Sequence, residues 1–187
     1  TAYEIPKRDW SSDVCSSDLA IIFTSLALSG EIKYFLPFDI KYQTLSKSTQ
    51  QQVDCLAQNI YHEAGYETHE GKVAVAMVTL NRLASGNYAG DVCGVVKQKT
   101  NGTCQFTWYC AAEALTIRNV SLYNDIRNLA VKVLMNYDNM KDITDGATYY
   151  HADYVNPGWR LPKTTKIGRH IFYKSSKDTV TSKELNI

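Results

Sequence analysis

Apolar residues recur at helical spacing through most of the chain, and alternating spacing appears only near its C-terminal end. Residues 50–64 carry an apolar face with the i, i+3, i+4, i+7 spacing of a helix, and Ser48 or Thr49 can cap it. Residues 70–84 are apolar nearly all round, which predicts a buried central helix. Residues 121–137 repeat the one-sided pattern. These three stretches predict a helical core.

Shorter elements complete the predicted domain. Residues 91–98 favour a short helix that begins at Asp91, a residue type common at helix N-caps. Residues 104–110 alternate polar and aromatic side chains, which favours a short strand or an ordered loop. Residues 147–155 and 165–174 predict two strands joined by a long loop. The sequence therefore predicts an α+β domain with a small C-terminal β-sheet.

The N-terminal region contains an apolar run at about residues 19–29, which falls well short of the roughly 20 residues that a membrane helix needs. Lys7 and Arg8 precede it and small residues end it, as in a secretory signal segment. We therefore expect an exported protein, in the cell envelope, the periplasm or the medium, and not an integral membrane protein. The predicted segments are an N-terminal stretch without further assigned structure (1–30), an extended lead-in (31–49), the domain (50–174) and a polar tail (175–187).

Composition is that of an ordinary globular domain: the chain has 187 residues, of which 44% are hydrophobic and 21% are charged. Its 20 basic and 19 acidic residues give a net charge of +1, so no basic field for nucleic acid is present. Tyrosine is abundant, at 13 residues, and its amphipathic ring suits both protein cores and carbohydrate faces. Composition therefore excludes a nucleic-acid partner and is compatible with a sugar ligand.

The five cysteines are Cys15, Cys55, Cys93, Cys104 and Cys110. The Cys-x-x-Cys spacing of zinc ribbons and thioredoxins is missing. Cys15 precedes the signal segment, and the other four suggest two disulfides formed in an oxidising compartment; the alternative is four buried free thiols. Four cysteines allow three pairings. We predict Cys93–Cys104, across a short loop, and Cys55–Cys110.

A carboxylate ends the apolar face of the first predicted helix. Glu63 lies about 20° from Leu56 around the helix axis. Burial against apolar side chains and the negative end of the helix dipole both raise the pKa of a carboxyl group. Such a carboxyl can donate a proton to a glycosidic oxygen near neutral pH. Glu63 is therefore the candidate general acid; the alternatives are a carboxylate that reaches solvent, or one paired with a buried His or Arg.

Other chemistries have weaker sequence support. A catalytic cysteine paired with His151 or His170 lacks its usual motif, and disulfides would consume the thiols. The His-Glu pair at 62–63 begins like a zincin, but the second histidine would fall on Tyr66. We therefore predict neither a metal nor another cofactor. Glu67 and Glu70 follow the helix break, and Glu70 is expected to cap the next helix.

A series of motifs in order spans about residues 50–174. They are Tyr61-His62-Glu63-Ala64, Glu67, Glu70-Gly71, Val73-Ala74-Val75-Ala76, Leu80-Asn81-Arg82, Val92-Cys93-Gly94-Val95-Val96, Cys104-Gln105-Phe106-Thr107-Trp108, Gly146-Ala147-Thr148-Tyr149-Tyr150-His151-Ala152, Val155, Pro157, Trp159 and Ile167-Gly168-Arg169-His170-Ile171-Phe172-Tyr173. Together they resemble the SleB/CwlJ-type cell wall hydrolases, which include spore-cortex-lytic enzymes. Relatives usually read His-Glu-Ala-Arg-Gly-Glu at the corner, whereas this chain has Ala64-Gly65-Tyr66-Glu67 after its His-Glu and lacks the Arg.

The resemblance implies a lysozyme-like, lytic-transglycosylase-like fold and peptidoglycan glycan strands as the partner. It matches Glu63 to the family's catalytic glutamate, which would protonate the oxygen between N-acetylmuramic acid and N-acetylglucosamine and then act as base. The muramyl 6-hydroxyl would close a 1,6-anhydro ring, whereas attack by water would give hydrolysis. Gln105, Trp108, Tyr150 and His151 are the candidate substrate-binding residues. The opposing hypotheses are a wall-binding module without activity and a zinc-dependent hydrolase.

Overall fold

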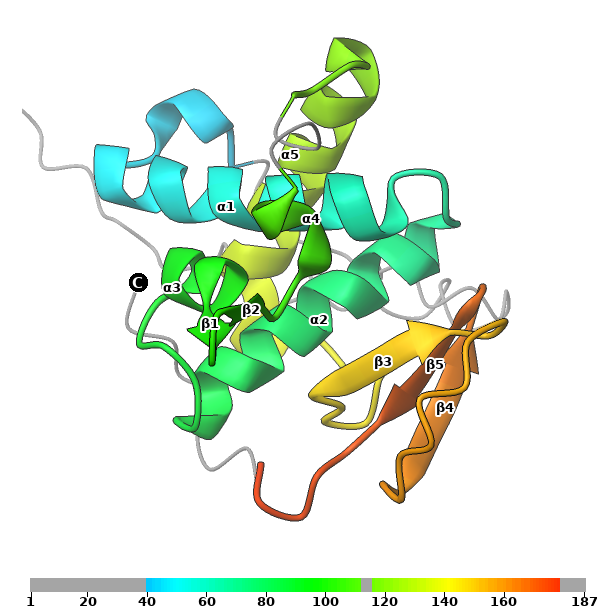
Figure 1. Cartoon of the computed structure of the whole chain (residues 1–187). Helices are drawn as coiled ribbons and strands as arrows, with labels where there is room; N and C mark the ends of the chain where they lie inside the picture. The colour runs from blue at the N-terminus through cyan, green and yellow to red at the C-terminus, as the bar shows by residue number, and fades with distance from the viewer. Residues whose placement is uncertain (1–39, 112–115, 179–187) are drawn as a thin grey trace, which may run out of the picture. The chain divides into compact units, whose positions relative to one another are not determined.

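The computed structural model describes residues 40–111 and 116–178, and Figure 1 shows how their helices and strands are arranged. The elements are η1 (Tyr42–Thr44), α1 (Lys47–Ala64), α2 (His69–Ser85), α3 (Val92–Lys97), β1 (Lys99–Thr100), β2 (Thr103–Cys104), α4 (Thr107–Cys110), α5 (Val120–Asn136), η3 (Tyr137–Asn139), β3 (Tyr149–Ala152), β4 (Lys163–Ile167) and β5 (His170–Tyr173). The predicted signal segment and Cys15 lie outside the described residues. Within them, a two-stranded hairpin, β1–β2, lies between α3 and α4, and the three-stranded sheet follows the last helix, which confirms the predicted α+β class.

Polar side chains determine where the first two helices begin. Ser46 caps α1, because its hydroxyl accepts the backbone N–H of Thr49 at 3.1 Å. The predicted caps, Ser48 and Thr49, are wrong because both already lie inside the helix. Thr68 caps α2 with its hydroxyl. Glu70, expected to act as a helix cap, lies in the first turn of α2 as predicted, where its charge complements the helix dipole, while the N-cap hydrogen bond comes from Thr68.

Helix α2 is buried on two sides, as its nearly continuous apolar sequence predicts. One side belongs to the main core, together with residues of α1, α3 and α5, and the other packs under Phe172 of the sheet. Figure 1 shows α2 between these helices and the sheet. The side chains in the main core are Val73, Ala76, Met77 and Leu80, and those under the sheet are Ala74 and Val78.

The sheet has three antiparallel strands in the order β3-β5-β4. The prediction of a single strand over residues 165–174 is wrong, because Gly168 and Arg169 form a turn that separates β4 from β5. Gly168 has a φ of +55°, in the left-handed region that favours glycine. The turn is only two residues long, so the sequence on either side looks continuous. This order leaves β3, with Tyr150, at one edge of the sheet.

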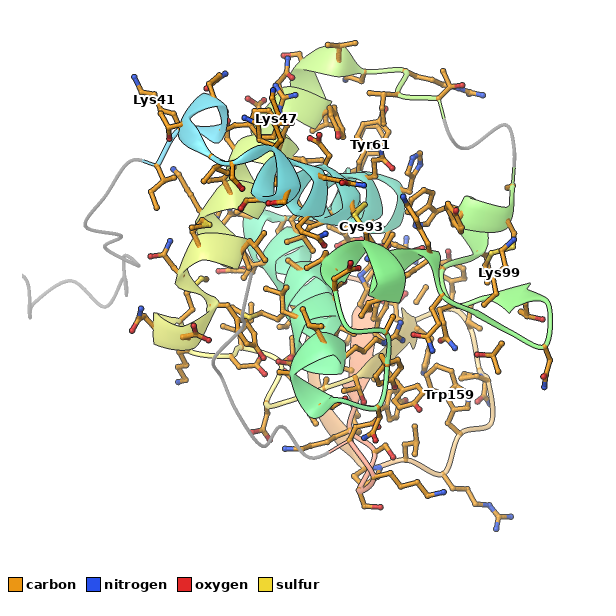
Figure 2. The ribbon with its side chains drawn as sticks, turned by 90° about the vertical axis from the view of Figure 1, so that its left-hand side faces the viewer. Lys41, Lys47, Tyr61, Cys93, Lys99 and Trp159 are labelled. Atoms are coloured by element: carbon orange, nitrogen blue, oxygen red, sulfur yellow. A yellow bond between two sulfur atoms is a disulfide. The ribbon has the colours of Figure 1, made fainter. Side chains whose placement is uncertain are left out.

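Both disulfide pairings differ from the predicted ones. Cys55 of α1 bonds to Cys93 of α3, and Cys104 of β2 bonds to Cys110 of α4, so the predicted Cys93–Cys104 and Cys55–Cys110 are wrong. Packing of α1 against α3 brings the first pair to a Cα separation of 5.1 Å. The region predicted as a strand or loop ends in the helical turn α4, which returns Cys110 to Cys104. Figure 2 shows Cys93 where α3 faces α1.

The described parts of both flanks pack on the domain. Residues 42–44 form a 3-10 helix rather than an extended lead-in, and the Tyr42 hydroxyl donates to Asp54 at 2.7 Å. Residues 175–178 are not a free polar tail, because Asp178 is buried and accepts hydrogen bonds from the hydroxyls of Thr148 and Tyr88. Among the helices in the described ranges, none combines the length and the apolar character that crossing a bilayer requires.

Candidate active site

Glu63 lies in the last turn of α1, and β3 brings Tyr150 against it. The Tyr150 hydroxyl donates to Glu63 Oε2 at 2.9 Å, across 87 positions of sequence. The Tyr150 ring packs edge-to-face on His170, with ring centroids 5.1 Å apart, and is tilted on Phe172 at 5.7 Å. Because these neighbours belong to β5, the sheet fixes the position of the hydroxyl that reaches the end of α1.

Burial raises the pKa of Glu63, while the Tyr150 hydroxyl and the Arg82 guanidinium lower it by less. The net direction is upward, as predicted from its position on the apolar face. Burial and the neighbouring Glu63 carboxylate raise the pKa of Tyr150 well above its ordinary value, so the phenol stays protonated and continues to donate. A buried carboxyl held in this way can keep a proton near neutral pH and give it to a bound substrate.

A buried arginine on α2 supplies positive charge to the site. Arg82 Nε donates to the backbone oxygen of Thr148 at 2.7 Å. Its guanidinium carbon lies 5.0 Å from the ring centroid of Phe106 and 5.3 Å from that of Tyr88. Among the described residues, Nη1 has no hydrogen-bond partner. Arg82 is thus held by one hydrogen bond and by aromatic rings, and its charge favours the ionised form of Glu63.

The corner after Glu63 leaves no space for the arginine that relatives carry there. Gly65 stands at that position, and a Cβ on it would come within 2.5 Å of the backbone oxygen of Tyr61. The next side chain, Tyr66, is 91% exposed. In this chain, the positive charge that acts on Glu63 therefore comes from Arg82 of α2 rather than from the corner.

His62, the neighbour of Glu63, stacks on Trp108 of α4 with ring centroids 4.5 Å apart. Trp108 is buried, and its Nε1 donates to Asn59 Oδ1 at 3.0 Å, while the Asn59 amide donates to Thr79 at the same distance. Burial lowers the pKa of His62, which favours the neutral imidazole near pH 7. His62 and Trp108 thus support the end of α1, and a direct contact of Trp108 with substrate stays a prediction.

The other two predicted binding residues, Gln105 and His151, form their hydrogen bonds with residues other than Glu63. Gln105 is half-buried beside the β1–β2 hairpin, and its amide donates to Thr100 at 3.3 Å. His151 points to the face of the sheet opposite Tyr150, because successive residues of a strand alternate. Its Nδ1 lies 2.8 Å from the backbone oxygen of Ala152, and its Nε2 lies 3.0 Å from the Tyr173 hydroxyl. Of the predicted binding residues, the structure therefore brings Tyr150 directly to Glu63.

Sequence reasoning assigned no role in the site to Arg82 or Glu67. Glu67 Oε2 accepts the backbone N–H of Arg169, in the β4–β5 turn, at 3.3 Å. A local signal existed for Arg82, which is a polar side chain in a helix that is apolar nearly all round. The hydrogen-bond partner of Arg82 is Thr148, 66 residues away in sequence, and that of Glu67 is Arg169, 102 residues away. Local sequence patterns could not identify these contacts.

The structure also locates the groups that the alternative chemistries would use. Cys55, Cys93, Cys104 and Cys110 are all in disulfides, so a Cys–His pair has no free thiol in the described residues. Across residues 40–111 and 116–178, no three His, Cys, Asp or Glu side chains converge as a metal site would require. The acid chemistry that this arrangement offers is centred on Glu63.

Comparison with known proteins identifies the domain. A family model described as Cell Wall Hydrolase matches residues 66–173, which is more than half of the chain. The chain belongs to the cell wall hydrolase family. The match begins three residues after Glu63, so a catalytic role for Glu63 stays a prediction.

Spore cortex-lytic enzymes are similar to much of the chain. The chain is 32% identical to the one from Halalkalibacterium halodurans over 123 residues, which cover 64% of this chain and 34% of the relative. It is 31% identical to the one from Bacillus subtilis over 124 residues, which cover 63% and 35%. The chain thus spans about a third of the length of these two curated relatives.

Two solved structures share the fold. The catalytic domain of the germination-specific lytic transglycosylase SleB from Bacillus anthracis matches with a TM-score of 0.52 and 29% identity, over 67% of this chain and 95% of that domain. The catalytic domain of the Bacillus cereus SleB protein matches with a TM-score of 0.50 and 28% identity, over 67% and 91%. The predicted lysozyme-like, SleB-type α+β fold is confirmed.

Proposed function

We propose that this protein cleaves peptidoglycan glycan strands between N-acetylmuramic acid and N-acetylglucosamine, as a lytic transglycosylase with Glu63 as its single acid and base. The observation that carries the proposal is the buried Glu63 carboxyl, with raised pKa and the Tyr150 hydroxyl on Oε2, in a domain of the cell wall hydrolase family. Similarity to the SleB lytic transglycosylase supports the reaction class. The substrate places the protein outside the cytoplasm, in agreement with the predicted signal segment.

In the proposed mechanism, protonated Glu63 gives its proton to the glycosidic oxygen as the bond to the muramyl C1 breaks. The resulting carboxylate is stabilised by the Tyr150 hydroxyl and by the charge of Arg82. It then takes the proton of the muramyl 6-hydroxyl as that oxygen bonds to C1, which forms the 1,6-anhydro ring and restores protonated Glu63. Because the second nucleophile belongs to the substrate, the enzyme needs no second carboxylate.

The test is Glu63→Gln, which keeps a hydrogen-bond acceptor for Tyr150 but cannot transfer the proton. Clearing of purified peptidoglycan should slow by about 10²–10⁴-fold, the usual contribution of a general acid. Mass spectrometry of the wild-type digest should show anhydromuramyl ends. Reducing ends would indicate hydrolysis by water, and undiminished clearing by the variant would exclude Glu63 as the acid.

The variant should remain folded, and its stability provides an internal control. In the native state burial raises the pKa of Glu63 above its unfolded value of about 4.3. The native state therefore binds the proton more tightly, and wild-type stability decreases as pH rises from the unfolded pKa to the native pKa. Glu63→Gln should lack this decrease and be at least as stable as wild type at pH 7, as measured by thermal unfolding.

A wall-binding module without activity is the second candidate, because the corner after Glu63 lacks the arginine of relatives and exposes Tyr66. It predicts that the wild-type protein sediments with peptidoglycan and leaves turbidity unchanged. A zinc-dependent hydrolase instead predicts clearing that a chelator abolishes and release of peptides rather than sugars. The same digest therefore separates the three functions.

A further inference from the structure

The face of the sheet that points away from Phe172 carries a group of rings that the proposed acid chemistry does not use. Tyr150 and Phe172 are paired across β3 and β5 on the inner face, so Tyr149, His151 and Tyr173 lie on the other. Trp159, from the loop after β3, packs edge-on against these three rings at centroid distances of 5.8, 5.5 and 5.8 Å. We call Tyr149, His151, Trp159 and Tyr173 the outer aromatic cluster.

Trp159 remains 41% exposed although three rings hold it. A single exposed apolar ring is common at protein surfaces, but here three further rings gather around the indole, and such an aromatic patch open to water is typical of a binding surface. Figure 2 shows Trp159 on the same side of the ribbon as Lys99 of the β1–β2 hairpin. The exposed surface of Trp159 is therefore available to a ligand.

The cluster is rigid as well as exposed. His151 stacks on Tyr173, with centroids 5.2 Å apart and an interplanar angle of 22°, and both of its ring nitrogens have polar partners. Gly158, with a φ of +68°, directs the chain into Trp159, and its N–H donates to Asn156 Oδ1 at 3.1 Å. A ring fixed in this way loses little side-chain entropy when it binds, which favours affinity.

The chemistry of the cluster suits a hydroxylated ligand. The rings that contact Trp159 carry phenol and imidazole groups, which can exchange hydrogen bonds with hydroxyls. The charged groups beside the cluster are cationic: the guanidinium carbon of Arg82 lies 5.9 Å from the Tyr149 ring, and Lys163 is the cross-strand partner of Tyr173. A pyranose has an apolar C–H face that can lie on an aromatic ring and a rim of hydroxyls that can bond to its neighbours. A sugar therefore fits the exposed face of the indole.

We propose that Trp159 stacks on a pyranose ring of the glycan strand, at a position separate from the bond cleaved beside Glu63. This rests on the proposed function, since the ligand is another part of the same polymer. Strand β3 is at the edge of the sheet and presents Tyr150 to Glu63 on one face and the outer aromatic cluster on the other. A long glycan that passes this edge can therefore contact both.

The test measures binding without cleavage, in a Glu63→Gln background, to glycan strands from which the peptides have been removed. Adding Trp159→Ala should weaken sedimentation binding by at least about fivefold, and Trp159→Phe should restore most of it because a ring remains. The matched control is Tyr154→Ala. Tyr154 is 76% exposed in the same loop, and its ring contacts the guanidinium of Arg169. This control should change binding by less than about twofold.

Several results would overturn the proposal. One is equal binding with and without Trp159, and another is an equal loss in the Tyr154 control. Failure of the Glu63→Gln parent to bind the peptide-free glycan would do the same. A loss seen only with peptide-bearing peptidoglycan would assign the surface to the peptide instead. Activity of Glu63→Gln in the clearing assay would remove the proposed acid but leave the binding result standing, so the two failures are distinguishable.

Discussion

Glu63, Glu67 and Glu70 are close in sequence, but each has a different environment. Glu63 and Glu67 are both half-buried, but Glu63 accepts from the Tyr150 hydroxyl, whereas Glu67 accepts the backbone N–H of Arg169. Glu70 is exposed in the first turn of α2. A carboxyl becomes useful as a proton donor when burial outweighs the interactions that favour its charge. Burial raises the pKa of Glu63, which is the direction that this role needs.

At the residue scale, Tyr150→Phe should move the pH profile of activity in a defined direction. In the wild type, the hydrogen bond from Tyr150 lowers the pKa of Glu63. Its removal in the variant therefore raises that pKa further. The general acid acts in its protonated form, and activity is lost as pH rises through its pKa. The alkaline limb of the clearing rate should therefore shift to higher pH. The plateau rate should decrease about tenfold, because the carboxyl loses its fixed orientation.

Tyr42→Phe is the matched control, since the Tyr42 hydroxyl also donates to a carboxylate, that of Asp54, at 2.7 Å. It should leave the alkaline limb in place. A shift of the Tyr150→Phe limb to lower pH, or the same shift in both variants, would contradict the role given to Tyr150.

At the element scale, local patterns predicted the helices better than the sheet. The cores of α1, α2 and α5, and the Asp91 cap of α3, follow from spacing and capping chemistry that lie within a few residues. The β4–β5 turn was missed because Gly168 alone marks it. The helical turn α4 was missed because its alternating aromatic residues suit a strand as well as a helical turn. The helical turn allows Trp108 to stack on His62, a contact that lies outside the local pattern. Long-range contacts such as Tyr150 to Glu63 have no local signal.

The contact between the α1–α2 corner and the β4–β5 turn leads to a prediction about Gly168. A Cβ at this position would collide with Glu67 Oε2, and the φ of +55° is strained for other residues. Gly168→Ala should therefore lower the free energy of unfolding by about 1–2 kcal/mol of backbone strain, plus a smaller cost for turning the Glu67 carboxylate away from Arg169. Gly102→Ala, with a φ of +80° and open space around it, should cost only the strain. Urea unfolding measures both.

A double-mutant cycle separates the two contributions. In a Glu67→Ala background the collision is gone, and Gly168→Ala should cost about as much as Gly102→Ala, roughly 1–2 kcal/mol. If the cost of Gly168→Ala is the same in both backgrounds, the carboxylate of Glu67 does not fill the space beside the turn.

At the scale of the whole molecule, the two disulfides have different tasks. Cys55–Cys93 joins α1 to α3 across a sequence separation of 38, whereas Cys104–Cys110 closes a separation of 6 around α4. Sequence could supply the number of bridges but not the pairing, because the pairing depends on which helices pack together. The long bridge constrains the chain as a whole. The short bridge holds the turn whose Trp108 stacks on His62, beside Glu63.

The long bridge should therefore contribute more to stability, and the short bridge should contribute more to activity. Replacing Cys55 and Cys93 by Ser should cost about 4 kcal/mol of unfolding free energy, and replacing Cys104 and Cys110 about 2 kcal/mol, because loop entropy increases with loop length. Among molecules that remain folded, the short-bridge variant should clear peptidoglycan more slowly, since α4 no longer holds Trp108 against His62. Denaturant unfolding and clearing rates per folded molecule provide the measurements. If the long-bridge variant is the less active of the two, Trp108 does not support the site through α4.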